Sequence, residues 1–243
     1  MGCELNTIYY ADCLEIMKEI PDSSVDCLVT DPPYRLIAGG DSNNKFGGRL
    51  VGGMLNRKQV NSRSGKLFSE NDIQFDDWLP IVYRIMKPKT HSYIMVNDRN
   101  MQELLNISEK CGFKLVNILV WKKNNATPNK FYMKNIEFIV MLRKGGERWI
   151  KYMDSKQCIE IENIIGNKMH PTEKPVRLME YLIENSTDVG DTVLDPFMGS
   201  GTTAISCINI NRNYMGMEKD EEYYKLALKR IAQHKVQQTL FRG

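Results

Sequence analysis

The sequence lacks the cysteine and histidine patterns that bind structural metals or form disulfide frameworks. Its six cysteines are scattered without a CxxC pair, and it has only three histidines. This spacing argues against a structural zinc site and against a secreted, disulfide-bonded scaffold. Long apolar runs that could cross a membrane are missing, and the first residues show no signal-peptide pattern. We therefore expect an intracellular protein with reduced thiols and no membrane association.

Repeats and low-complexity linkers are also missing, and 243 residues suit one large α/β domain. Strand-like and helix-like segments alternate along the chain. This alternation predicts a mostly parallel, seven-stranded sheet with helices on both faces, in a single domain over residues 1–243. The predicted strands are residues 7–12, 24–31, 92–97, 114–121, 136–143, 191–197 and 213–218.

Acidic residues are scarce in two segments that interrupt the alternation. Between residues 35 and 68, seven lysines and arginines and seven glycines accompany a single acid, Asp41, which predicts a basic insertion over about residues 35–75. Residues 121–135 contain four lysines, no acid, and the aromatic residues Trp121, Phe131 and Tyr132. Basic and aromatic side chains together suit phosphates and unstacked bases, although a solvated surface loop is the alternative. The candidate DNA contacts are Arg35, Arg49, Arg57, Lys58, Arg63, Lys122, Lys123, Lys130 and Tyr132.

A glycine-rich turn is present near the C-terminus, although the dinucleotide pattern GxGxxG is absent. In VLDPFMGSGTTA (193–204), a strand ends at Asp195, a turn containing Gly199 and Gly201 follows, and a helix begins. The next predicted strand ends at Glu218, on the order of 20 residues later, where an acid typically accepts hydrogen bonds from ribose hydroxyls. The pattern predicts an adenosine-type cofactor site; a nicotinamide dinucleotide site and a purely structural turn are the alternatives.

A second unusual strand end is LVTDPPY (28–34), where an apolar strand runs into an acid, two prolines and a tyrosine. Proline cannot donate to a sheet ladder, so Pro32 ends the strand and fixes the chain beyond it. A carboxylate, a rigid turn and an aromatic ring are thereby placed together at the end of a buried strand.

The two strand ends together resemble the amino-group DNA methyltransferases that use S-adenosylmethionine. DPPY (31–34) matches their catalytic motif, and DPFMGSGTT (195–203) matches their cofactor motif. The catalytic motif comes first, as in the β class of these enzymes, and MHPTEKPVRLMEYLI (169–183) and ADCLEIMKEIPDSSVDCLVTDPPY (11–34) are also similar to the family. The resemblance covers most of the chain. It implies a Rossmann-like class I methyltransferase fold with permuted motif order and S-adenosylmethionine as cofactor, with S-adenosylhomocysteine as product.

The resemblance also implies a reaction at an exocyclic amine, whose lone pair is delocalised into the ring. The Asp31 carboxylate and the Pro32 carbonyl would accept its two hydrogens, Pro33 would help to hold that carbonyl rigid, and Tyr34 would stack on the base. The base would flip out of the duplex, and the methyl group would pass directly to nitrogen. DPPY favours adenine N6, with cytosine N4 as the alternative. A Pro-Cys dipeptide, which cytosine carbon-5 methyltransferases use, is absent.

The cofactor residues follow from the same resemblance. Asp12 would meet the adenine amine, although it could instead cap a helix. His170 would lie along the methionine side, although it could be an ordinary loop histidine. The full implied cofactor site consists of Asp12, Cys13, His170, Thr172, Lys174, Asp195, Pro196, Phe197, Gly199, Ser200, Gly201, Thr202, Thr203 and Glu218.

The sequence departs from many β-class enzymes at the place of target recognition. Only residues 145–168 lie between the predicted hairpin and the HPT-containing motif, so this short segment is the candidate, with the two basic segments sharing the task. The expected partner is DNA, with a homodimer and a cognate restriction endonuclease left open. The expected location is the cytoplasm of a bacterial or phage-infected cell. A dehydrogenase, a non-catalytic DNA-binding protein and an RNA or protein methyltransferase remain as alternatives.

Overall fold

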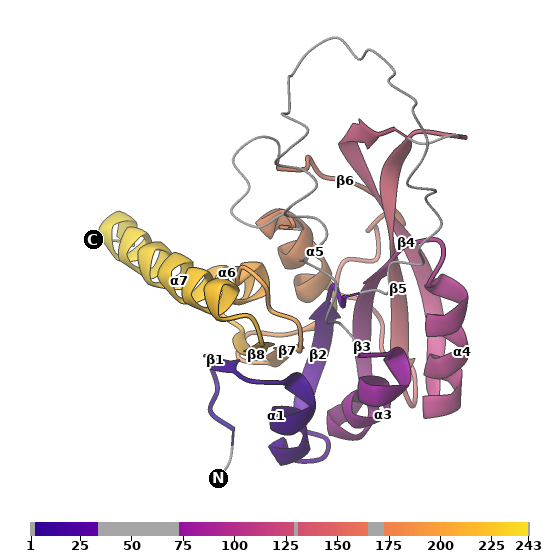
Figure 1. Ribbon diagram of the computed structural model, residues 1–243, viewed down its shortest axis with the longest axis horizontal. Helices are drawn as coiled ribbons and strands as arrows, with labels where there is room; N and C mark the ends of the chain where they lie inside the picture. The colour runs from indigo at the N-terminus through magenta and orange to yellow at the C-terminus, as the bar shows by residue number, and fades with distance from the viewer. Residues whose placement is uncertain (1–2, 34–72, 129–130, 165–172, 243) are drawn as a thin grey trace, which may run out of the picture. The chain divides into compact units, whose positions relative to one another are not determined.

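The computed structural model describes residues 3–33, 73–128, 131–164 and 173–242, with side chains as far as residue 239 (Figure 1). The chain divides into two units, residues 1–32 together with 75–243, and residues 33–74. Of the second unit only Pro33, Ile73 and Gln74 are described. The fold and the candidate site described below belong to the first unit, and the predicted insertion at residues 35–75 stays a prediction.

The centre of the first unit is an eight-stranded sheet with the order β1-β8-β7-β2-β3-β5-β4-β6. Neighbouring strands run parallel, except that β5 is antiparallel to both β3 and β4. The strands are β1 Thr7–Tyr10, β2 Val25–Thr30, β3 Met86–Val96, β4 Phe113–Thr127, β5 Lys134–Lys144, β6 Cys158–Glu160, β7 Thr192–Asp195 and β8 Asn213–Glu218.

The helices form two groups, one on each face of the sheet. In the first group α1 contacts α3 and α3 contacts α4, and in the second α5 contacts α6 and α6 contacts α7 (Figure 1). Every residue of the central strand β2 is buried, as expected when helices cover both faces of a sheet. The helices are α1 Cys13–Glu19, α3 Phe75–Ile85, α4 Met101–Cys111, α5 Val176–Ser186, α6 Thr202–Asn209 and α7 Glu221–Arg242.

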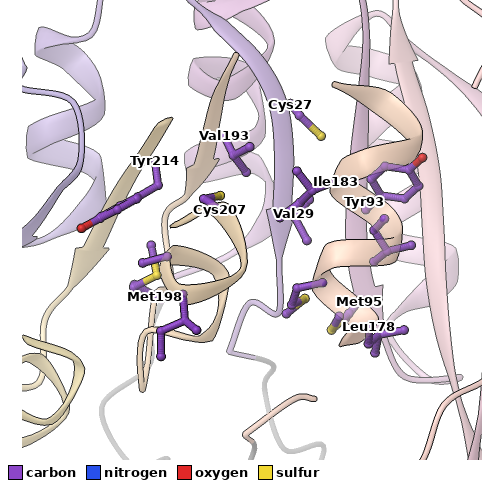
Figure 2. Packing of buried hydrophobic residues seen from close by; sticks show 14 of the residues in the cluster. Cys27, Val29, Tyr93, Met95, Leu178, Ile183, Val193, Met198, Cys207 and Tyr214 are labelled. Carbon is purple, nitrogen blue, oxygen red and sulfur yellow. The ribbon is translucent and has the colours of Figure 1, made fainter. Parts of the chain in front are cut away.

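The main hydrophobic core lies between the sheet and the second group of helices. Successive strand side chains point to opposite faces, so Cys27 and Val29 of β2 join this core while Leu28 faces the first group. Figure 2 shows Cys27 and Val29 together with Leu178 and Ile183, which α5 contributes. The apolar runs in the strand sequences thus reflect burial on both faces.

Two helix boundaries show why the sequence folds as it does locally. Gly112 ends α4 in the left-handed conformation with φ 98°, and an added Cβ atom would lie 2.9 Å from the Tyr83 ring. Glycine alone suits both demands. Pro175 immediately precedes α5, where the missing N–H of proline costs no helical hydrogen bond.

The predicted fold class is confirmed, with two differences in detail. An eighth strand, the three-residue β6, pairs with β4 at one edge of the sheet and comes from the short segment 145–168. The segment 121–135, interpreted as a loop, consists largely of strand, because β4 continues to Thr127 and β5 begins at Lys134. Backbone pairing such as Lys122↔Ile136 extends this hairpin, and ladder hydrogen bonds do not need apolar side chains. Among the helices that the structure describes, none is long and apolar enough to cross a membrane.

The sheet order fixes the place of the site. Strands β2 and β7 are parallel neighbours, but the chain leaves β7 through α6 toward β8 and leaves β2 toward β3 on the other side. Such a reversal of strand order opens a crevice at the carboxyl ends of the two strands, where α/β proteins bind ligands. The two motifs singled out in the sequence, DPPY and DPFMGSGTT, begin at these two strand ends.

Candidate active site

The carboxylate at the end of β7 is buried and fully engaged by the protein. Asp195 is 3% exposed; its Oδ1 accepts hydrogen bonds from Thr30 Oγ1 (2.7 Å) and the Phe197 N–H (3.1 Å), and its Oδ2 from Thr203 Oγ1 (2.6 Å). Burial raises the pKa of Asp195 to about 6, although the three donors oppose the shift and the charge of Asp31 adds to it. Asp195 therefore joins β2, β7 and α6.

The glycine-rich turn that follows Asp195 has the predicted backbone. Gly199 and Gly201 adopt positive φ angles of 54° and 82°. A Cβ atom on Gly201 would lie 3.1 Å from the Cβ of Ala227, so this position has neither the conformation nor the room for a larger residue.

Glu218, at the end of β8, fastens this turn. Its Oε2 accepts the N–H of Gly199 at 2.8 Å, and its Oε1 accepts the N–H of Asp220 at 2.8 Å. Burial raises the pKa of Glu218, while these backbone donors oppose the shift. Glu218, the residue predicted to bind the ribose, thus also holds the backbone of the glycine-rich turn in place.

A buried ion pair that the sequence did not reveal holds the other side of the turn. Arg230 of α7 donates to the carbonyl oxygen and to Oγ of Ser200 at 2.6 and 2.7 Å, and it pairs with Glu173 at 2.6 Å. The side chains of Arg230 and Glu173 are only 11% and 5% exposed. In the sequence, Arg230 looks like any charged residue of a surface helix, so no local signal could have found this contact.

The carboxylate at the end of β2 lies in a different environment. Asp31 forms an ion pair with Lys174, and the ammonium of Lys174 also lies 3.5 Å from Oε2 of Glu137. Burial lowers the pKa of Lys174, but the charges of Asp31 and Glu137 outweigh burial and raise it above its ordinary value. Lys174, predicted to line the cofactor, thus contacts the predicted catalytic carboxylate in this structure, and its cofactor role stays a prediction.

The residues around the glycine-rich turn fit an adenosine-bearing cofactor. The buried hydroxyl of Thr202, at the start of α6, has no hydrogen-bond partner within the described part of the chain. A buried polar atom of this kind indicates a missing partner. The open glycine backbone, the Glu218 carboxylate and this hydroxyl are what a ribose and its neighbouring groups would need.

Four other predicted cofactor residues lie in the described part of the chain. Asp12 caps α1, with Oδ1 accepting the N–H of Leu14 at 2.8 Å, and Cys13 is buried beside it. The Phe197 ring packs edge-on against Trp78 of α3, with centroids 5.4 Å apart. Pro196 lies between Asp195 and Phe197 at the start of the turn. Their cofactor contacts stay predictions.

Several predicted residues lie outside the described residues, and their roles stay predictions. For the base and the cofactor these are Tyr34, His170 and Thr172. For DNA they are Arg35, Arg49, Arg57, Lys58, Arg63 and Lys130.

The remaining DNA candidates lie on the β4–β5 hairpin. Tyr132 is 88% exposed, and Lys122 forms an exposed pair with Glu160 at 2.9 Å. Lys123 differs, because its side chain is 11% exposed and its ammonium lies 2.9 Å from Oε1 of Glu137. Trp121, the first aromatic residue of the basic segment 121–135, is buried, and its Nε1 donates to the Ile161 carbonyl at 2.7 Å, so it is not exposed for contact with bases.

The sheet order, with one antiparallel strand and a glycine-rich turn at the reversal point, defines a Rossmann-like methyltransferase fold. Residues 25–229 match the family model N6_N4_Mtase, described as DNA methylase, and the chain belongs to this family. It is therefore an S-adenosylmethionine-dependent DNA amino-methyltransferase, as the motifs predicted.

Individual relatives agree with the family assignment. The chain is 29% identical to the Type II methyltransferase M2.DpnII of Streptococcus pneumoniae, over 92% of this chain and 88% of the relative. It is 28% identical to M.HinfI of Haemophilus influenzae, over 95% and 69% of the two chains. Among solved structures, the M1.HpyAVI–SAM complex is 28% identical with a TM-score of 0.69, covering 92% of this chain and 98% of that one. The PvuII cytosine-N4 methyltransferase shares the fold, with 18% identity, a TM-score of 0.69, and coverage of 93% and 86%.

Proposed function

We propose that this protein methylates adenine N6 within a specific DNA sequence, taking the target base out of the duplex into the site beside Asp31. The observation that carries the proposal is the position of Asp31: the Asp-Pro-Pro sequence follows β2 directly, and β2 neighbours the strand that leads into the cofactor turn. The DPPY form of the motif supports adenine over cytosine. The Type II methyltransferases among the relatives support action at defined DNA sites.

In this proposal Asp31 binds the target amino group. Its carboxylate accepts one amino hydrogen and the carbonyl of Pro32 accepts the other, which draws the nitrogen toward the tetrahedral geometry of a nucleophile. S-adenosylmethionine supplies the methyl group from its sulfonium. The ion pair with Lys174 holds the carboxylate before substrate arrives, so less reorganisation is needed during the reaction.

The cofactor side divides into residues that bind and residues that support. Glu218 would accept hydrogen bonds from the ribose hydroxyls while it also accepts the Gly199 N–H. Thr202 would contribute its hydroxyl, which lacks a hydrogen-bond partner among the described residues. Asp195 is 3% exposed and accepts three hydrogen bonds, from Thr30, from Thr203 and from the Phe197 N–H, so it holds the strand ends and the start of the turn. Its predicted part in cofactor binding is therefore indirect.

DNA contact is assigned to the β4–β5 hairpin, which contains the basic segment 121–135, and to the basic segment 35–75. Tyr132 and Phe131 are 88% and 89% exposed, and the same hairpin carries the exposed Lys122, which suits stacking and phosphate contact. Because the relatives are Type II methyltransferases, we propose a cognate restriction endonuclease as functional partner and the bacterial cytoplasm as location. A homodimer stays a prediction.

The test is to express the chain in a host whose DNA lacks N6-methyladenine and N4-methylcytosine, and to analyse digested DNA by mass spectrometry. N6-methyladenine should appear with the wild-type chain and disappear with Asp31→Ala. Asp22→Asn, which changes an exposed carboxylate paired with Arg84, is the control and should leave methylation intact. N4-methylcytosine in place of N6-methyladenine would overturn the adenine assignment, and methylation by Asp31→Ala would overturn the role of Asp31.

A further inference from the structure

Four charged side chains of alternating sign extend from Asp31 into the β4–β5 hairpin. Asp31 pairs with Lys174, Lys174 lies 3.5 Å from Glu137, and Glu137 lies 2.9 Å from Lys123. The two lysine side chains are 9% and 11% exposed, whereas exposed pairs such as Lys122–Glu160 are 50% and 68% exposed. The series is electrically balanced, as buried charges must be.

The antiparallel direction of β5 brings Glu137 to the active site. Strands β2, β3 and β4 run in the same direction, so their carboxyl ends lie at the end of the sheet where Asp31 follows β2. Strand β5 runs the other way and therefore begins at that end. Glu137, the fourth residue of β5, is paired with Trp121 across the ladder, and the ammonium of Lys123 lies 5.9 Å from the Trp121 ring centroid. Glu137 and Lys123 are thus fixed by the hairpin, at the edge where the reaction takes place.

The charges show which groups hold Glu137. Burial raises the pKa of Glu137, but the ammonium groups of Lys174 and Lys123 outweigh burial and lower it below its ordinary value. Glu137 is therefore an ionised carboxylate between two lysines. A lysine ammonium on its flexible stem has no preferred direction of its own, so the carboxylates around it decide where it lies.

We propose that Glu137 and Lys123 are positioning residues for the catalytic carboxylate: Lys123 fixes Glu137, Glu137 fixes Lys174, and Lys174 orients Asp31 toward the target amino group. The proposal rests on the proposed function, because it assumes that Asp31 receives the target amine. It gives Lys123 a role other than a phosphate contact. A reacting group displaced by about 1 Å can lose on the order of 100-fold in rate, so distant residues that hold Asp31 matter.

Single-turnover methylation at saturating DNA and S-adenosylmethionine tests this role, since it reports the chemical step without binding. Glu137→Gln should slow this step about 10- to 100-fold, and Glu137→Asp should recover part of the loss. Lys123→Met should slow it less, by about fivefold. The double variant should be no slower than Glu137→Gln, because both changes break the same series of contacts. Dissociation constants for DNA and cofactor should stay within about threefold, and Asp22→Asn serves as the unaffected control.

Two results would overturn the positioning role of Glu137 and Lys123. A wild-type single-turnover rate for Glu137→Gln would overturn the proposal, even if thermal stability fell, because the contacts would then be structural only. If Glu137→Gln does not fold, Lys123→Met decides: an unchanged rate with weaker, less salt-dependent DNA binding would identify Lys123 as a phosphate contact and overturn the proposal. Asp31→Asn, measured in parallel, tests the proposed function by itself. Retained methylation in that variant would refute the role of Asp31, whatever Glu137 does.

Discussion

Two Asp-Pro sequences end neighbouring strands of the sheet, and their surroundings differ. Asp31, after β2, pairs with the ammonium of Lys174, and its side chain is 21% exposed. Asp195, at the end of β7, accepts two hydroxyl donors and one N–H, and it is 3% exposed. A side-chain hydrogen bond from Thr30 to Asp195 joins the two strand ends. The same dipeptide therefore lies in two different environments: an ion pair beside Lys174 in one place and a buried set of three hydrogen bonds in the other.

The difference shows how environment assigns a role to a carboxylate. A side chain that must meet a substrate needs access and a partner that orients it, and Asp31 has both. A side chain that must hold a turn needs its oxygens used by the protein, and both oxygens of Asp195 are used. The family resemblance places Asp195 among the cofactor residues, and a cofactor contact of Asp195 stays a prediction.

Removing the ammonium beside Asp31 should have the largest effect on stability. Lys174→Met leaves Asp31 and Glu137 as neighbouring carboxylates without their shared cation, and it should lower the free energy of unfolding by about 3 kcal/mol. Urea unfolding measures this loss. Lys225→Met, which breaks an exposed pair with Glu221, is the matched control and should cost much less, because water screens an exposed pair. Equal losses in the two variants would show that the active-site pair contributes no more than a surface pair.

Glu218→Ala should affect the cofactor more than the fold. The variant loses the acceptor proposed for the ribose and should weaken S-adenosylmethionine binding by about 1.5–3 kcal/mol, the value of a hydrogen bond to a charged group. Isothermal titration calorimetry measures this change. Glu222→Ala, on the exposed first turn of α7, is the control. Unchanged affinity in Glu218→Ala would remove Glu218 from the cofactor site.

The buried carboxyl of Asp195 should make stability depend on pH. Its pKa of about 6 lies above that of an aspartate in the unfolded chain, so the folded state holds a proton that the unfolded state releases first. Its contribution is fully present below about pH 4 and is lost as the pH rises through about 6. The stability difference between wild type and Asp195→Asn should therefore shrink by on the order of 2 kcal/mol over this range. A difference that stays constant with pH would contradict the raised pKa.

Thr30→Val should have the smallest effect, because it removes only the hydrogen bond that joins the two strand ends. Asp195 keeps its bonds to Thr203 and Phe197, so the loss should be about 1 kcal/mol in the free energy of unfolding. Thr7→Val, at an outer strand of the sheet, is the control for the change in side chain. A Thr30→Val protein as stable as its control would show that the strand ends are held by other contacts.

The local parts of this site could be predicted from the sequence. DPPY and DPFMGSGTT each lie within one strand end and one turn, so the residues that form them are neighbours in the chain. The ion pair of Lys174 with Asp31 joins residues 143 positions apart, and Glu137 reaches it only through the register of β4, β5 and β3. Arg230 depends in the same way on how α7 packs against the glycine-rich turn. Sequence patterns report local conformation and burial, but these contacts depend on tertiary packing.

The most direct test compares Asp31→Asn with Asp195→Asn in two measurements on each protein, the single-turnover methylation rate at saturating cofactor and DNA, and the free energy of unfolding at about pH 5. We predict that Asp31→Asn loses at least about 100-fold in rate, and that it also loses stability, because the buried Lys174 ammonium keeps only the Glu137 carboxylate. Asp195→Asn should lose stability, because the amide nitrogen cannot accept a hydrogen bond as either carboxyl oxygen can, yet its rate should stay within about tenfold of wild type. A rate loss in Asp195→Asn as large as that in Asp31→Asn, or a wild-type rate in Asp31→Asn, would contradict the division of roles between the two strand ends.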